Sequence, residues 1–186
     1  MSVALQYKLL GPEEWEKQRF QLLRFVRRHG ERRITGRAWQ RLLLAGEAEL
    51  ARPGTAIAVA YTQGGCPAGL AFAENFGEAG CLVAVHPALR GRGVGRKLIG
   101  ELAGPWSRLT CSVALDNAAS VAMCFAAGLV AVGLETGPTG KPTLRFVWRG
   151  DDASRREADS GFTPATAPLA PTDESLPPEA AAPTRR

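Results

Sequence analysis

The sequence predicts a single α/β domain in which helices cover the faces of a mixed, mostly antiparallel sheet. Two observations lead to this prediction. Apolar residues switch between strand-like and helix-like spacing over residues 1–150, in the order β-α-α-β-β-β-α-β-α-β-β. The 186 residues are 45% hydrophobic and 22% charged, which is the composition of an ordinary globular protein.

The composition changes after Gly150. Residues 151–186 hold six of the 13 prolines, and seven Asp and Glu against four Arg. Large apolar residues are too few there to form a core that offsets the entropy of ordering the chain. We therefore expect a folded domain over residues 1–150 and a disordered, acidic Pro/Ala-rich tail over residues 151–186. The whole chain has a formal net charge of +5, so the domain carries the basic excess.

The N-terminal half is expected to begin with a strand and two helices. Residues 5–10 have a strand pattern that stops at Gly11, and Pro12 suits the first turn of a helix that continues to about Val26. The apolar spacing of residues 37–50 predicts the second helix.

Strands and helices alternate in the remainder of the domain. A hairpin is expected from strands over residues 55–61 and 66–75, and a further buried strand over residues 80–85. A helix follows over residues 93–102. The last expected elements are a strand, a short helix and two strands, over residues 109–115, 118–127, 129–134 and 143–148.

The most informative stretch is the glycine-rich turn between the strand at 80–85 and the next helix. Residues 90–95 read RGRGVG. Glycines let the backbone bend so that its N–H groups converge, and the helix N-terminus adds positive potential. Such a turn binds a phosphate or a diphosphate. Its spacing fits neither the dinucleotide fingerprint nor the P-loop.

This turn, preceded by Val85-His86-Pro87, resembles the acetyl-CoA signature (Arg/Gln)-x-x-Gly-x-(Gly/Ala) of the GCN5-related N-acetyltransferase (GNAT) family. Residues 117–129 are similar to a second sequence block of that family, and the order of elements agrees over residues 1–150. The resemblance implies a single GNAT-type domain whose sheet is splayed between its central strands.

The resemblance also implies the cosubstrate and the reaction. Acetyl-CoA would donate its acetyl group directly to a primary amine of a small molecule or peptide. The strand backbone would bond the pantetheine arm and polarise the thioester carbonyl, and the turn would hold the diphosphate. The implied cofactor-binding residues are Val83, Ala84, Val85, Arg90, Gly91, Arg92, Gly93, Val94, Gly95, Arg96 and Asn117.

Three residues are candidates for proton transfer. The glutamate of the histone-modifying branch of the family would fall on Ala79, so Glu78 beside it and Glu74 on the preceding strand are candidate bases. Each is also explained as a solvated carboxylate at the rim. Cys124 stands where the family has a tyrosine that often protonates the departing thiolate. It either donates that proton or is a small buried hydrophobic residue.

No metal site is expected, because the four cysteines and two histidines lack ligand spacing. The sequence has no secretion signal and no run long enough to cross a membrane, so we expect a cytoplasmic protein with reduced thiols. No reader motif indicates a nucleic-acid partner. A homodimer remains open.

Arginines dominate residues 19–41, which suggests an electropositive rim for an anionic acceptor or an acidic peptide, or else a solvated helical face. Two other functions also remain open. One is a CoA-binding regulatory or sensor domain with little or no catalysis. The other is an interaction domain that keeps only the fold.

Overall fold

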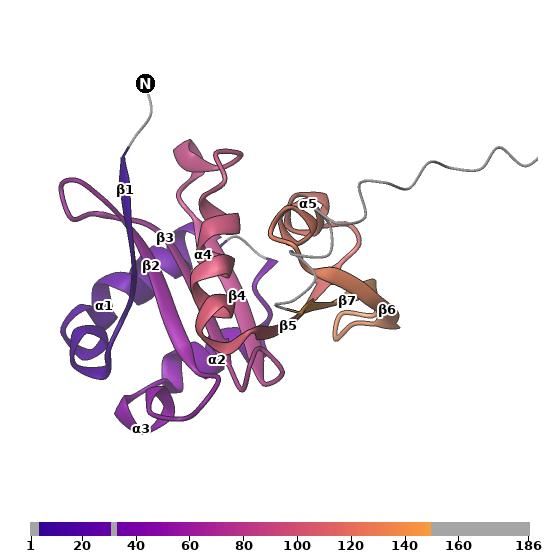
Figure 1. Ribbon diagram of the computed structural model, residues 1–186, viewed down its shortest axis with the longest axis horizontal. Coiled ribbons are helices and arrows are strands. Elements are labelled where there is room, and N and C mark those ends of the chain that lie inside the picture. The colour runs from indigo at the N-terminus through magenta and orange to yellow at the C-terminus, as the bar shows by residue number, and fades with distance from the viewer. Residues whose placement is uncertain (1–3, 31–32, 150–186) are drawn as a thin grey trace, which may run out of the picture.

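The protein is described by a computed structural model that covers residues 4–30 and 33–149, and the expected tail over residues 151–186 lies outside them. The strands form two antiparallel sheets (Figure 1). The first has the order β1-β2-β3-β4, with bounds Leu5–Leu9, Ala56–Thr62, Pro67–Glu74 and Gly80–Val85. The second has the order β5-β7-β6, with bounds Arg108–Ala114, Pro142–Arg149 and Val130–Thr136.

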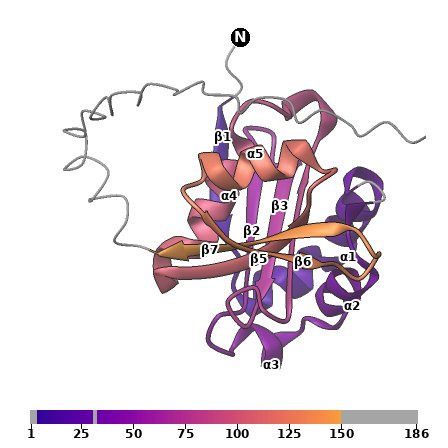
Figure 2. The ribbon, with the colours of Figure 1, turned by 90° about the vertical axis from the view of Figure 1, so that its right-hand side faces the viewer.

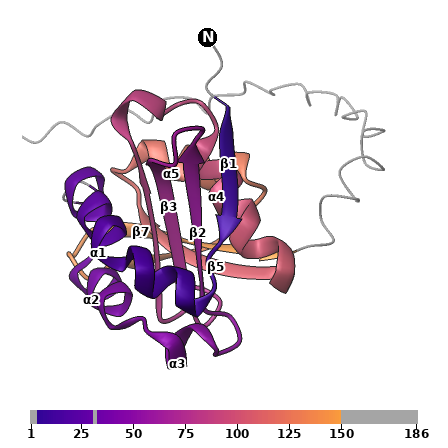
Figure 3. The same ribbon diagram turned by 90° about the vertical axis from the view of Figure 1, so that its left-hand side faces the viewer.

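The helices lie on both faces of the first sheet. Two of them, α1 and α2, cover one face, and α4 covers the other (Figures 1 and 3). The fifth helix, α5, packs beside the second sheet. The bounds of α1 to α5 are Pro12–His29, Gly36–Leu44, Glu47–Leu50, Val94–Ala103 and Ala118–Ala126, and short 3₁₀ turns span Pro87–Leu89 and Gly104–Trp106.

The helix expected over residues 37–50 is wrong in one respect, because it is broken into α2 and α3. The indole Nε1 of Trp15 donates to the carbonyl of Ala45 at 2.8 Å, and Trp15 is fully buried. Ala45 and Gly46 have extended backbone, and Gly46 is the N-cap of α3. The contact with α1 therefore ends α2 at Leu44, close to the one glycine of residues 37–50.

The first sheet separates two hydrophobic cores. Side chains alternate across each strand. On β4, Leu82 and Ala84 pack toward α1 and α2, whereas Cys81, Val83 and Val85 pack toward the core that α4 shares with the second sheet. This alternation fixes which face of β4 each helix covers.

The two sheets meet at one end and separate beyond it. The N–H of Thr110 on β5 donates to the carbonyl of Phe76 at 2.8 Å, just before β4. Gly77 has a φ of +90°, and a Cβ on it would lie 1.8 Å from the carbonyl oxygen of Thr110, so only glycine fits there. Past this contact β4 and β5 share no ladder, and the second sheet runs across the first (Figure 2). The splay expected between the central strands is confirmed.

Candidate functional site

The backbone of β4 presents toward β5 an edge that pairs with no strand of the described residues, although the carbonyl of Val85 accepts a side-chain bond from Nε of Arg90. Opposed residues of an antiparallel pair alternate between hydrogen-bonded and non-hydrogen-bonded pairs. The N–H of His86 donates to the carbonyl of Ala68 at 2.9 Å, so in the same register Ala84 bonds to β3. The backbone groups of Val83 and Val85 therefore point the other way, toward the splay.

The facing edge of β5 follows the same rule. The N–H of Thr110 donates to Phe76 rather than to β7. The backbone groups of Ser112 and Ala114, two and four residues further along β5, therefore also point away from β7. Two strand edges thus face each other without pairing. Backbone groups without partners are costly when buried, which makes these edges a natural place for a ligand with amide groups of its own.

The turn after β4 opens toward solvent above these edges. Gly91 and Gly93 have φ values of +71° and +79°, and no atom lies within 4 Å of a Cβ placed on either. Gly93 is the N-cap of α4, a ten-residue helix whose first N–H groups have no intrahelical acceptor. The turn and the helix start therefore form an anion-binding arrangement.

Arg90 fixes this turn in place. Its Nε donates to the carbonyl of Val85 at 3.2 Å, and its Nη2 donates to the carbonyl of His29 at 2.9 Å. The guanidinium therefore ties the turn to the end of β4 and to the last residue of α1. Arg92 and Arg96 are exposed on either side of Gly93. Any ligand charge at this turn meets the Arg92 and Arg96 side chains more readily than that of Arg90.

Asn117 lies at the other side of the splay, at the start of α5. Its Oδ1 accepts from the N–H of Ser120 at 3.3 Å, which caps the helix. The start of α4 lies close to the second half of α5, because a Cβ on Gly95 would lie 2.4 Å from the sulfur of Met123, six residues after Asn117.

Not every expected binding residue lies at the open edge. Ala84 turns its backbone to β3 and buries its side chain against α1 and α2, and Val94 is buried in the α4 core. A ligand therefore finds fewer accessible groups at Ala84 and Val94 than at Val83, Val85, Gly91 and Gly93.

Glu74 is almost fully buried at the end of β3, with 7% of its surface exposed. Its Oε1 lies 3.4 Å from Nη1 of Arg41 on α2, and its Oε2 is buried with no partner among the described residues. Glu74 pairs in register with Gly80, the first residue of β4. An unsatisfied carboxylate oxygen therefore lies beside the strand whose edge is open.

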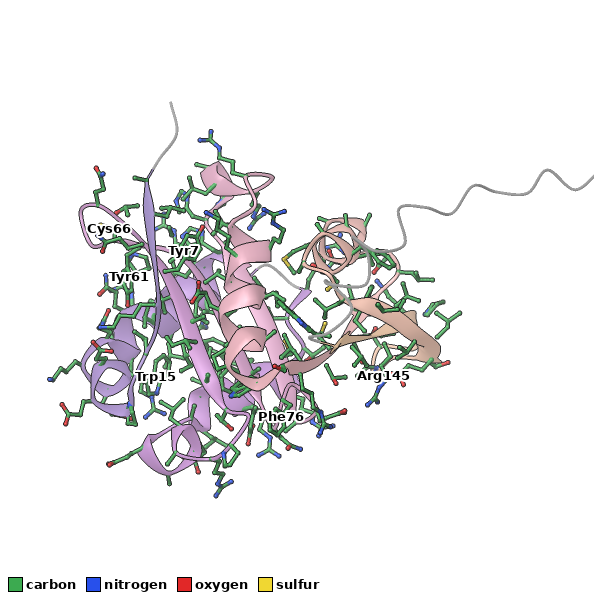
Figure 4. All side chains as sticks on the ribbon, in the orientation of Figure 1. Tyr7, Trp15, Tyr61, Cys66, Phe76 and Arg145 are labelled. Carbon is green, nitrogen blue, oxygen red and sulfur yellow. The ribbon has the colours of Figure 1, made fainter. Side chains whose placement is uncertain are left out.

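Glu78 is held differently. Both of its carboxylate oxygens accept from Nη2 of Arg145 on β7, at 2.7 and 2.9 Å. The Glu78–Arg145 ion pair joins the β3–β4 turn, which contains Phe76, to the second sheet. Figure 4 labels Phe76 and Arg145. Of the two candidate bases, Glu74 is the one with a free oxygen.

Sequence reasoning missed a cluster of thiols. Cys111 on β5 lies with its Sγ 3.7 Å from that of Cys124 on α5, and Cys81 on β4 is a second thiol that acts on the pKa of Cys111. The bond to Cys124, then Cys81 and burial, raise the pKa of Cys111 well above its usual value. The same bond from Cys111 lowers the pKa of Cys124. Alternation on β4 and β5 was the only sequence signal for this meeting. Cys66 is exposed on the β2–β3 hairpin, away from the cluster (Figure 4).

Between residues 4 and 149, with the gap at 31–32, no group of three or more His, Cys, Asp and Glu is arranged to hold a metal ion. Over the same residues, no helix is long and apolar enough to cross a membrane.

The comparison with family models identifies the class. The model of the acetyltransferase (GNAT) family matches residues 14–128, which is more than half of the chain. The chain therefore belongs to the GNAT family of acetyltransferases. No curated protein sequence matches it.

Solved structures share the fold at low sequence identity. A mutant spermidine N-acetyltransferase from Vibrio cholerae is 15% identical, with a TM-score of 0.59 over 82% of this chain and 98% of that one. A ribosomal-protein-S5-alanine acetyltransferase from Vibrio fischeri is 15% identical, with a TM-score of 0.55 over 82% and 96%. An aminoglycoside acetyltransferase in complex with coenzyme A and kanamycin is 17% identical, with a TM-score of 0.55 over 83% and 99%.

Proposed function

We propose that this GNAT acetyltransferase transfers acetyl from acetyl-CoA to a primary amine of a small molecule or peptide, by direct attack of the amine on the thioester. The observation that carries the proposal is the open edge of β4, which continues into the glycine turn and the start of α4. Pantetheine has two amide groups that suit a strand edge, and the diphosphate suits the turn.

Each backbone group has a role in this proposal. Val83 and Val85 bond the pantetheine arm, and one of their N–H groups polarises the thioester carbonyl. A single donor of this kind lowers a barrier by about 3 kcal/mol. The amides from Gly91 to Arg96 hold the diphosphate, and Asn117 fixes the far end of the arm.

Glu74 is the better supported general base. An amine with an ordinary pKa near 10.4 is protonated at neutral pH and must lose a proton before it attacks. The buried Oε2 of Glu74 has an unused acceptor site, whereas both oxygens of Glu78 are engaged by Arg145. We assign Cys124 to packing rather than to proton donation, because its side chain is buried and bonded to Cys111.

Two measurements test this function. Calorimetric titration of the full chain with acetyl-CoA tests binding, and release of free CoA over a panel of primary amines, followed with a thiol reagent, tests transfer. The exposed thiol of Cys66 would also react with such a reagent, so the assay is repeated with a C66S variant, which lacks this background reaction. Absence of acetyl-CoA binding would leave only an interaction domain.

The second candidate is a CoA-binding sensor domain. Two observations favour it. Cys124 stands in place of the family's tyrosine, and both carboxylate oxygens of Glu78 accept from Arg145. Tight acetyl-CoA binding without CoA release over the whole amine panel would establish it. The cytoplasmic location and a homodimer remain predictions.

A further inference from the structure

Three arginines at intervals of four residues follow the boundary where β4 and β5 separate. Arg33 precedes α2, and its Nη1 donates to the carbonyl of Asp116, just after β5, at 3.1 Å. Arg41 lies on α2, and its Cβ and Cγ are each 3.5 Å from the position of a Cβ on Gly80, at the start of β4. Arg37 lies one helical turn before Arg41 and therefore lies between these two contacts.

The acids at this boundary are already matched by cations. Glu74 pairs with Arg41, Glu78 with Arg145, and Asp116 with Lys141 and Arg33. Among the described residues, Arg37 has no such partner, and its side chain is exposed. The boundary therefore presents a surplus of positive charge that centres on Arg37.

One unsatisfied acceptor lies a helical turn away. The Oε2 of Glu74 is buried without a partner beside Gly80 and under Arg41. Movement of the exposed Arg41 side chain would open this acceptor to an ammonium, and Arg37 beside it offers a guanidinium donor to an anion. A ligand that satisfies both carries an amine and an anionic group on one small skeleton.

We propose that Arg37, flanked by Arg33 and Arg41, binds a carboxylate carried by the acceptor, which is a small amino acid. This inference rests on the proposed acetyl transfer and names its substrate class. A guanidinium binds a carboxylate through two parallel hydrogen bonds, so Arg37 orients the acceptor as well as attracting it. The amine of that acceptor would then lie at Glu74, the proposed general base.

The experiment compares acceptors that differ only in the anionic group. Each amino acid of a panel is assayed with its carboxamide and its decarboxylated amine, alongside a polyamine and an acidic peptide. We expect kcat/KM to be at least tenfold higher for the free acid than for its carboxamide. Equal rates for acid and carboxamide, or a preference for the polyamine or the acidic peptide, would overturn the inference.

Variants locate the effect. The R37Q variant should raise KM for the amino acid about tenfold or more and leave its kcat and the carboxamide rates nearly unchanged. The R52Q variant is the matched control, since Arg52 pairs with Glu49 beyond α3. If R37Q and R52Q behave alike, Arg37 does not bind the acceptor. If the folded, unmodified chain transfers acetyl to no amine of the panel, that result would instead contradict the proposed acetyl transfer itself.

Discussion

The Sγ atoms of Cys111 on β5 and Cys124 on α5 lie 3.7 Å apart in the core. This contact joins the second sheet to its helix and accounts for a cysteine at position 124. The same contact holds Cys124, which stands where the family has a tyrosine, as a buried residue of the core.

The C124A variant tests that assignment. We expect it to unfold at lower denaturant, with a loss of about 1–2 kcal/mol, because a buried sulfur leaves a small cavity. We expect kcat to stay within about threefold of the unmodified chain, whereas loss of a general acid would lower it by about 10²–10⁴. Urea unfolding and steady-state rates measure the two effects separately.

Glu74 and Glu78 should respond differently to removal of their charge. The E74Q variant is expected to lower kcat by about 10²–10⁴ with acetyl-CoA affinity retained, because the amine keeps its proton. The E78Q variant removes an ion pair with Arg145 and should change kcat less than tenfold. An E49Q variant controls for charge alone. A larger fall in kcat for E78Q than for E74Q would reverse the assignment.

The glycine turn should be sensitive to any side chain. Alanine at Gly91 or Gly93 must adopt a positive φ, which costs about 1–2 kcal/mol, and its methyl group enters the space assigned to the diphosphate. We expect at least a tenfold weaker affinity for acetyl-CoA by calorimetry. Gly100, which lies inside α4 with open space around it and no positive φ, is the control. The G100A variant should bind normally and gain about 0.5–1 kcal/mol of stability.

The pKa of Asp116 gives a pH test of its pairing with Lys141, which lies just before β7 in the second sheet. Its hydrogen bond from Lys141, and the nearby charges of Lys141 and Arg33, lower this pKa below the ordinary value of 3.8. A lowered native pKa means that the contribution of Asp116 to stability is present above about pH 4 and disappears as the pH falls through the native value. In the K141Q variant, NMR titration of the Asp116 carboxyl should give a pKa closer to 3.8. An unchanged pKa would contradict the pairing.

The parts of the fold that depend on local sequence could be predicted, and those that depend on distant contacts could not. The strand, turn and helix around Gly91 and Gly93 are encoded by consecutive residues. In contrast, the break between α2 and α3 depends on Trp15, 30 residues before Ala45. The ion pair of Glu78 depends on Arg145, 67 residues away in the chain, and no local sequence pattern predicts such a pair.

The same distinction applies to the site. The backbone positions Val83 and Val85 could be expected only from the resemblance to the family, because strand periodicity decides which residues share an edge but not which edge is left without a partner strand. The thiol cluster depends on how β4, β5 and α5 meet, and the distances between Cys81, Cys111 and Cys124 in the chain carry no sign of it.

Hydrogen exchange of single amides tests the open edge of β4 most directly. In the free chain, the amides of Val83 and Val85 should exchange quickly, while those of Leu82 and Ala84, which bond to β3, exchange slowly. Saturating acetyl-CoA should slow Val83 and Val85 by at least about tenfold and leave Leu82 and Ala84 unchanged, because each bound amide must open before it exchanges. Slow exchange at Val83 and Val85 in the free chain, or no change on adding acetyl-CoA, would contradict cofactor binding at this edge.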